Sequence, residues 1–440
     1  MTSHSRKKRE CGKPKRACLH TLGCRLNQAE TAIIEDELRT RGYDVVAFGE
    51  PADLAIINTC TVTREADAKA RQAIRGFVRA NPHAFTAVIG CYSQMGYDAI
   101  AAIEGVDLIV GNQEKLNVLD YVGETKNAVP TVVRGRIERD DFTIDRESAG
   151  GVSKRSNLKV QDGCDFMCSF CIIAFARGRA RSRALDDLLG EARLLVSRGV
   201  KEIVVAGVNI GLYRHDGKDI ADVAEALAQI DGLRRVRISS LELKTIPDRL
   251  LAMMDDPAHP LVPYVHVPLQ SGSDRILKAM KRRYTRKQFV EFVHRAKENV
   301  RDVCVGTDIM AGFPGETDGD FDDTLSVLRD APIDYAHVFK YSEREGTASA
   351  RLPDKVDPKD VTRRAAMARR LAAIKRRRFY EAHLGRELSV LFEDQQDGLW
   401  CGYTENYVRV GVRSSESLEN EIRQVRLTRL DGAMALGTLR

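Results

Sequence analysis

The sequence predicts an α/β protein with three parts: an N-terminal parallel α/β sheet domain, a partial (β/α)6 barrel and a small C-terminal all-β domain. Three patterns support this prediction. In the first third of the chain, short apolar runs typical of buried strands alternate with helical patterns. A strand–helix unit recurs through the middle of the chain. Near the end, apolar and polar residues alternate with the period of two that is typical of strands. A chain of 440 residues is long enough for about three domains.

The composition is that of a globular protein, with 43% apolar and 30% charged residues. No apolar run approaches the roughly 18 residues that span a bilayer, so no membrane partner is expected. Residues 1–15 are polar and basic without an apolar segment. We expect a disordered leader there and a cytoplasmic protein. The net charge of +6 permits a nucleic-acid partner without requiring one.

The residue pattern in the first third of the chain predicts a domain of strands and helices over residues 16–135. Strands are expected at 17–22, 53–58, 86–89 and 108–110, and helices at 29–40 and 64–80. This order of strand, helix and strand indicates a parallel sheet. Residues 136–155 are polar and contain Gly150 and Gly151, so a linker is predicted there.

The middle of the chain predicts a barrel domain over residues 156–382. Its expected strands are 158–161, 202–206, 235–239, 264–268, 303–309 and 335–339, with helices at 184–198, 220–229, 247–254, 286–298 and 317–329. Six units are fewer than the eight of a closed barrel, so an open barrel is predicted. A basic helix, 359–383, ends this domain. In residues 383–440, apolar and polar residues alternate along short segments, which predicts a small OB-like β domain.

Ten cysteines in a chain without an export signal favour metal or redox chemistry over disulfides. Cys164, Cys168 and Cys171 form a CxxxCxxC run just after the first barrel strand. Three thiolates in one loop can bind three corners of a [4Fe-4S] cluster and leave the fourth iron open. A structural zinc ion wants four ligands, and no second cysteine pair follows nearby.

A second trio is predicted from position rather than spacing. Cys24, Cys60 and Cys91 each follow a predicted strand of the N-terminal sheet. Because parallel strand ends meet at one edge, these thiols can hold a second cluster. The alternatives are three unrelated buried cysteines, or a cluster made by Cys11, Cys18 and Cys24. The other four cysteines, Cys11, Cys18, Cys304 and Cys401, are expected to be structural.

The CxxxCxxC run at the head of a partial barrel resembles the radical S-adenosylmethionine superfamily, and the whole chain after about residue 16 resembles its methylthiotransferase family. That family joins an N-terminal cluster domain, the barrel and a C-terminal TRAM domain. The segments TLGCRLNQAET, NTCTVT, IGCYSQ, CIIAFARGRARSR, PLQSGSD, TDIMAGFPGET and YSEREGT resemble its branch that acts on threonylcarbamoyladenosine beside the tRNA anticodon. The chain departs from the family at Ala174-Phe175, where proline and tyrosine are usual.

The resemblance implies two [4Fe-4S] clusters, two S-adenosylmethionine molecules and a tRNA substrate modified at carbon-2 of the adenine at position 37. Cys24, Cys60 and Cys91 would hold the cluster that binds the sulfur, and the barrel trio would hold the cluster that makes the radical. A flavodoxin- or ferredoxin-type electron donor is expected, and the sulfur donor is left open. Phe170 would flank the adenine of S-adenosylmethionine, or else pack as an ordinary core residue.

Polar residues at the predicted strand ends mark the rim on which S-adenosylmethionine would bind. They are Gly207, Asn209, Ser239, Ser240, Glu242, Gln270, Ser271, Thr307 and Asp308. Each can hydrogen-bond the ribose, amino or carboxylate groups of the cofactor, and each is as often a turn or capping residue.

The basic helix can contact RNA phosphates, and Trp400, Tyr403 and Tyr407 can stack on bases. A solvated charged face and an aromatic core are the alternatives. Three functions remain open: methylthiolation of threonylcarbamoyladenosine, the same chemistry on isopentenyladenosine or a ribosomal-protein aspartate, and non-catalytic RNA binding by an iron–sulfur protein.

Overall fold

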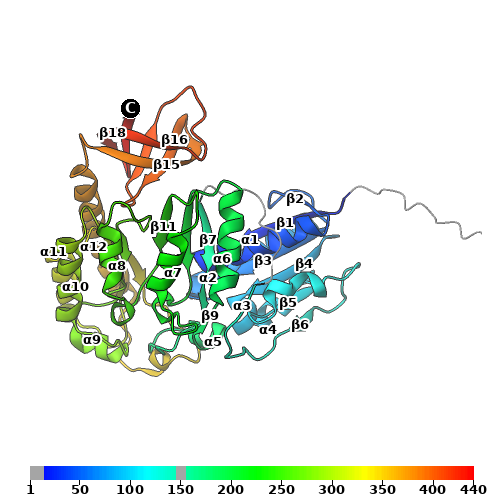
Figure 1. Ribbon diagram of the computed structural model, residues 1–440. Coiled ribbons are helices and arrows are strands. Elements are labelled where there is room, and N and C mark those ends of the chain that lie inside the picture. The colour runs from blue at the N-terminus through cyan, green and yellow to red at the C-terminus, as the bar shows by residue number, and fades with distance from the viewer. Residues whose placement is uncertain (1–13, 145–154) are drawn as a thin grey trace, which may run out of the picture.

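The computed structural model describes residues 14–144 and 155–440. Figure 1 shows three parts in chain order: a parallel sheet with helices, a half-open barrel and a small β-barrel beyond the end of a long helix. The predicted fold class is therefore confirmed. The predicted leader lies outside the described residues, except for its last two positions, and so does Cys11. Residues 145–154 of the predicted linker lie outside them as well.

The N-terminal domain is built on a six-stranded parallel sheet of order β2-β1-β3-β4-β5-β6. Its strands are β1 (Arg16–Thr21), β2 (Asp44–Val46), β3 (Leu54–Thr59), β4 (Phe85–Gly90), β5 (Leu108–Val110) and β6 (Thr131–Val133). Its helical segments are α1 (Arg25–Thr40), α2 (Arg64–Ala80), α3 (Cys91–Met95), α4 (Tyr97–Ala101) and η1 (Lys115–Tyr121). The edge strands β2 and β6 are absent from the prediction because three-residue strands carry little periodicity.

Six parallel strands in chain order form the open barrel. They are β7 (Arg155–Lys159), β10 (Glu202–Ala206), β11 (Arg235–Ile238), β12 (Tyr264–His266), β13 (Cys304–Ala311) and β14 (Tyr335–Lys340). They form two three-stranded sheets, β11-β10-β7 and β12-β13-β14. Single bridges, Val236 to Leu261 and Ser240 to His266, connect these sheets. The barrel is thus open between β14 and β7, and α1 of the N-terminal domain packs beside β7.

Helices cover the outside of the barrel and short elements line its end. The main helices are α6 (Leu185–Ser197), α7 (Ile220–Ala228), α8 (Arg249–Asp255), α10 (Arg286–Asn299) and α11 (Asp318–Asp330). The short elements are β8 (Gln161–Asp162), α5 (Ile173–Arg177), β9 (Arg181–Ser182), η2 (Ile210–Leu212), η3 (Leu243–Thr245), α9 (Asp274–Ala279) and η4 (Ala348–Arg351). Capping boxes at Asp219, Thr285 and Thr317 begin three of the helices.

The helix α12 (Pro358–Glu381) leads to a closed five-stranded barrel of order β15-β16-β17-β19-β18. Its strands are β15 (Glu387–Gln396), β16 (Leu399–Thr404), β17 (Arg409–Val412), β18 (Ile422–Asp431) and β19 (Met434–Leu439). Phe379 and Tyr380 of α12 join its apolar core. In Figure 1 this barrel stands at the end of the molecule opposite α5 and α9.

None of the helices in residues 14–144 and 155–440 combines the length and apolar character of a membrane span.

A group of buried charged side chains lies where the open barrel packs against the C-terminal barrel. Glu202 pairs with Arg237 at 2.7 Å, and both are fully buried. Arg235 and Arg237 also donate to C-terminal backbone carbonyls, at Ser389 (2.9 Å) and Glu405 (2.8 Å). Burial opposes the charge of Glu202, but the two arginines outweigh it and lower its pKa to about 2.

We expect Glu202→Gln to lower the free energy of unfolding by about 3–5 kcal/mol, because it leaves the buried guanidinium of Arg237 without a counter-ion. The loss should appear in denaturant unfolding followed by Trp400, the single tryptophan, which lies in the C-terminal barrel. The stabilisation by Glu202 is complete above its ordinary pKa of 4.5 and disappears as pH falls toward about 2.

The variant should therefore lack this acid-dependent loss of stability. Glu298→Gln is the control, because Glu298 is exposed on the barrel surface. Equal midpoints for Glu202→Gln and wild-type protein would contradict the role of the ion pair.

Candidate functional site

Three cysteines lie at the carboxyl edge of the N-terminal sheet. Cys24 is the residue before α1, Cys60 follows β3, and Cys91 begins α3 directly after β4. Cys60 and Cys91 are buried, whereas Cys24 is exposed. Burial and the nearby thiols of Cys91 and Cys24 raise the pKa of Cys60 to about 12. The sheet therefore brings the three predicted residues together, as parallel strand ends require.

Two residues hold the loops that carry this N-terminal trio. Gly23 adopts φ +110°, and a Cβ atom there would lie 2.7 Å from Cβ of Cys60. Only glycine fits this turn without moving the neighbouring cysteine. Asn27 donates from Nδ2 to the carbonyls of Leu22 (2.8 Å) and Thr59 (3.0 Å), which precede the two cysteine loops. The prediction missed Asn27, although it lies one helical turn from Cys24.

The second trio lies in the loop between β8 and α5. Burial raises the pKa of Cys171 to about 12 and raises the pKa values of Cys164 and Cys168 as well. The sulfur of Cys164 accepts from the backbone N–H of Phe166 at 3.5 Å. The backbone N–H of Cys171 donates to the carbonyl of Cys168 at 3.0 Å, so the loop turns tightly.

The donors of both trios suit an iron–sulfur cluster. A [4Fe-4S] cubane binds each cysteine thiolate through a different iron, and three thiolates leave one iron open. The donors are soft, buried thiols that release protons when metal binds. The donor sets therefore fit two iron–sulfur clusters, each with three protein ligands.

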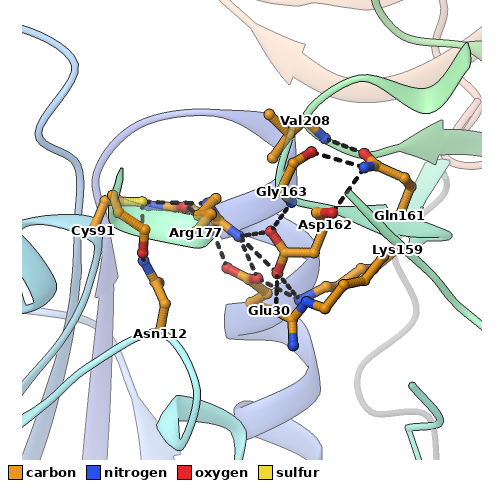
Figure 2. Close-up of polar contacts among 12 residues, drawn as sticks. Glu30, Cys91, Asn112, Lys159, Gln161, Asp162, Gly163, Arg177 and Val208 are labelled. Atoms are coloured by element: carbon orange, nitrogen blue, oxygen red, sulfur yellow. Dashed lines mark hydrogen bonds and ion pairs between the residues drawn. The ribbon is translucent and has the colours of Figure 1, made fainter. Parts of the chain in front are cut away.

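Arg177 of the barrel domain contacts a sulfur of the N-terminal trio. Arg177 ends α5, just after the barrel cysteines, and its Nε donates to Sγ of Cys91 at 3.3 Å. Its Nη1 donates to Asp162 at 3.0 Å, and its Nη2 donates to Asn27 at 2.6 Å. Figure 2 shows this guanidinium between Cys91 on one side and Glu30 and Asp162 on the other. The sequence motif contains Arg177, but the sequence assigns it no partner.

Two of the predicted rim residues lie beside the barrel trio. Nδ2 of Asn209 is 3.9 Å from Sγ of Cys164. Glu242 forms an ion pair with Arg282, whose Nη1 donates to Sγ of Cys168 at 3.2 Å. Arg282 was not predicted, because it lies more than a hundred residues from the motif.

Other predicted rim residues are engaged within the fold. Thr307 donates to the carbonyl of Val267 at 2.8 Å, and Ser271 lies 3.3 Å from Oγ1 of Thr324. A Cβ at Gly207 would lie 2.6 Å from Ile210. Phe170 packs on an apolar cluster with Phe313. Ser239, Ser240 and Gln270 are partly exposed. Their contact with S-adenosylmethionine stays a prediction.

The open side of the barrel is lined by polar rings. Nε2 of His266 lies 3.1 Å from Asp308, and its Nδ1 lies 2.8 Å from the hydroxyl of Tyr335. The ring of His337 packs edge-on against Tyr335 at 5.3 Å and is exposed. Phe339 follows on the same face of the edge strand β14 and is 46% exposed. This opening therefore offers both stacking and hydrogen-bonding groups.

The predicted RNA-stacking aromatics lie mainly at a domain junction. Tyr403 stacks on Tyr407 at 4.8 Å, and Tyr407 accepts a hydrogen bond from Arg25 of α1 at 2.7 Å. Trp400 packs on the core of the C-terminal barrel. The basic helix α12 is divided: Arg364 is buried against Glu316, whereas a set of cations remains exposed. The exposed set is Lys359, Arg363, Arg369, Arg370, Arg376, Arg377 and Arg378.

Comparison with protein families matches residues 158–328 to the radical SAM superfamily and residues 16–111 to "Uncharacterized protein family UPF0004". The chain is 35% identical to threonylcarbamoyladenosine tRNA methylthiotransferase MtaB of Bacillus subtilis, over 93% of this chain and 92% of the relative. MtaB of Aquifex aeolicus is 36% identical, over 90% and 96%. A tRNA-2-methylthio-N(6)-dimethylallyladenosine synthase of Cereibacter sphaeroides is 33% identical, over 93% and 95%.

Among solved structures, the radical S-adenosylmethionine methyltransferase TsrM of Kitasatospora setae, with tryptophan and a SAM analogue bound, is similar in fold. The TM-score is 0.53 at 14% identity, over 74% of this chain and 73% of that chain.

We expect Gly23→Ala to prevent assembly of the N-terminal cluster while the barrel cluster still forms, because the new methyl group displaces Cys60. Iron and acid-labile sulfide, measured per chain after anaerobic reconstitution, should fall to about half of the wild-type content. Gly42→Ala is the matched control: Gly42 also has positive φ, at +83°, but has no atom within 4 Å of the added methyl. Full iron content in Gly23→Ala would refute this role of the turn.

Proposed function

Because this chain belongs to the radical S-adenosylmethionine family of tRNA methylthiotransferases, we propose that it converts threonylcarbamoyladenosine at position 37 of tRNA to its 2-methylthio derivative. The proposal includes two [4Fe-4S] clusters, two S-adenosylmethionine molecules and a cytoplasmic location. The observation that carries it is the pair of cysteine trios, one from each domain, with Arg177 of the barrel domain donating to Cys91 of the N-terminal trio.

The proposed roles of the two trios are carried over from the family resemblance, motif by motif. Cys24, Cys60 and Cys91 would hold the cluster that receives the sulfur, and Cys164, Cys168 and Cys171 would hold the other. When bound, the barrel cluster supplies the electron that cleaves S-adenosylmethionine and yields the 5′-deoxyadenosyl radical. The protein's own part is to position the reactants and to exclude water. Asn209 and Glu242, next to Cys164 and Arg282, are the best-placed rim residues for contacting the cofactor.

Two observations favour the threonylcarbamoyl substrate over isopentenyladenosine. Two of the most similar relatives, at 35% and 36% identity, carry the threonylcarbamoyladenosine name. The barrel opening also presents the exposed ring of His337. Its ring nitrogens suit a side chain with a urea and a carboxylate better than a hydrocarbon side chain.

The exposed cations of α12 are the proposed contact for the tRNA backbone. Arg370, Arg376 and Arg377 are exposed on α12, which packs behind β14 at the edge of the barrel opening. Phosphate contacts of this kind give affinity that weakens with salt. The electron donor is proposed to be of flavodoxin or ferredoxin type.

We expect Cys164→Ala to abolish formation of 5′-deoxyadenosine, because the radical cannot be made without the barrel cluster. Cys60→Ala should retain some cleavage of S-adenosylmethionine but form no methylthio product. Both are measured by chromatography of reconstituted protein with threonylcarbamoylated anticodon stem-loop RNA. Cys401→Ala is the control, since Cys401 is buried in the C-terminal barrel. Normal methylthio product from Cys60→Ala would refute the role of the N-terminal trio.

Cells lacking the protein should lose 2-methylthio-threonylcarbamoyladenosine from digested tRNA, and the unmethylthiolated nucleoside should accumulate. Mass spectrometry of the nucleosides measures both. Loss of the isopentenyl derivative would assign the protein to the sister reaction, and a change in a ribosomal-protein aspartate would exclude RNA as the substrate. Bound iron and RNA without cleavage of S-adenosylmethionine would indicate a non-catalytic protein.

A further inference from the structure

Each cysteine trio has one buried arginine that donates to a ligand sulfur. Arg177 donates to Cys91 at 3.3 Å in the N-terminal trio, and Arg282 donates to Cys168 at 3.2 Å in the barrel trio. The two arginines differ in their surroundings. Arg282 has one carboxylate partner, Glu242. Arg177 belongs to a larger ionic group that crosses the domain interface.

That group comprises five charged side chains, each no more than 5% exposed: Glu30, Lys115, Lys159, Asp162 and Arg177. Glu30 and Lys115 come from the N-terminal domain and the other three from the barrel. Lys159 donates to Glu30 at 2.9 Å and to Asp162 at 2.7 Å, while Lys115 pairs with Glu30. Figure 2 shows Lys159 and Arg177 meeting the same two carboxylates.

The charges in this group do not balance. Three cations face two carboxylates, and Arg181, 3.8 Å from Asp162, adds further positive charge. The cations hold the pKa values of Glu30 and Asp162 below their ordinary range. Burial, followed by the charge of Arg177, lowers the pKa of Lys115 to about 8. An excess buried charge is costly unless an anion is nearby. With a cluster bound, the sulfur of Cys91 would be ionised and would be the anion that Arg177 faces.

We propose that Arg177 is the counter-ion of the N-terminal cluster: it raises the reduction potential of that cluster and holds Cys91 in place against the barrel. The inference rests on the proposed function, since it needs the cluster. A cation and an N–H···S hydrogen bond stabilise the reduced state, which carries one more negative charge. Arg177 is thus a positioning residue that also acts through its charge.

The test is a spectroscopic redox titration of the full-length chain carrying one cluster at a time. Replacing Cys164, Cys168 and Cys171 by alanine leaves the N-terminal cluster to be titrated alone. In this background, Arg177→Gln should shift the midpoint to more negative potential. Glu30→Gln should shift it in the opposite direction, because it removes a negative charge from the same group. A purely structural role would not produce opposite shifts.

Arg282→Gln is the matched control. It should leave the potential of the N-terminal cluster unchanged and lower that of the barrel cluster, titrated alone after Cys24, Cys60 and Cys91 are replaced by alanine. If Arg177→Gln does not assemble the cluster, the midpoint potentials of Arg177→Lys and Glu30→Gln test the proposal instead. Unchanged midpoints in Glu30→Gln and in the assembled Arg177 variant would overturn the inference. Normal potentials with no cleavage of S-adenosylmethionine would instead reject the proposed function.

Discussion

The burial of one guanidinium determines how the two halves of this protein meet. Arg177 cannot lose its charge, and burial removes its water, so its five N–H groups must find acceptors in protein. They find Cys91, Asn27 and Glu30 in one domain and Asp162 in the other. Cys91 belongs to the N-terminal trio, and Asp162 lies directly before the loop that carries the barrel trio. Arg177 therefore links the N-terminal trio to the segment that precedes the barrel trio.

The second domain junction follows the same principle with different residues. Glu202 and its two arginines lie at the barrel floor, and the arginines donate to carbonyls of the C-terminal barrel. Apolar surfaces can pack in several registers, whereas buried ion pairs tolerate few, because a misplaced charge has no partner. Both junctions thus combine modest net stabilisation with a strict geometry, which suits an enzyme whose reacting groups come from separate domains.

The environment of the thiols suits metal binding rather than reaction as free thiolates. Burial raises the pKa values of Cys60 and Cys171 to about 12, so without metal these thiols stay protonated near neutral pH. Binding of iron must displace those protons, and the binding free energy then contributes to the stability of the loops. Cations near the sulfurs, Arg177 and Arg282, favour the ionised form that the metal requires.

The sequence by itself determined the fold class and predicted the composition of both trios, because periodicity and strand-end positions are local properties. It predicted Cys24, Cys60 and Cys91 as neighbours, since parallel strands share an edge.

The sequence did not reveal Asn27, Arg177 or Arg282 as residues that contact the two trios or their loops, nor the short strands β2 and β6. It left open whether Tyr403 and Tyr407 stack on bases or pack within the protein, and the structure shows them packed at the barrel junction. Contacts between residues such as Arg177 and Glu30, 147 positions apart, exist only when domains dock. Tertiary structure alone decided them, because the free energy of a buried charge depends on every neighbour and not on its own segment.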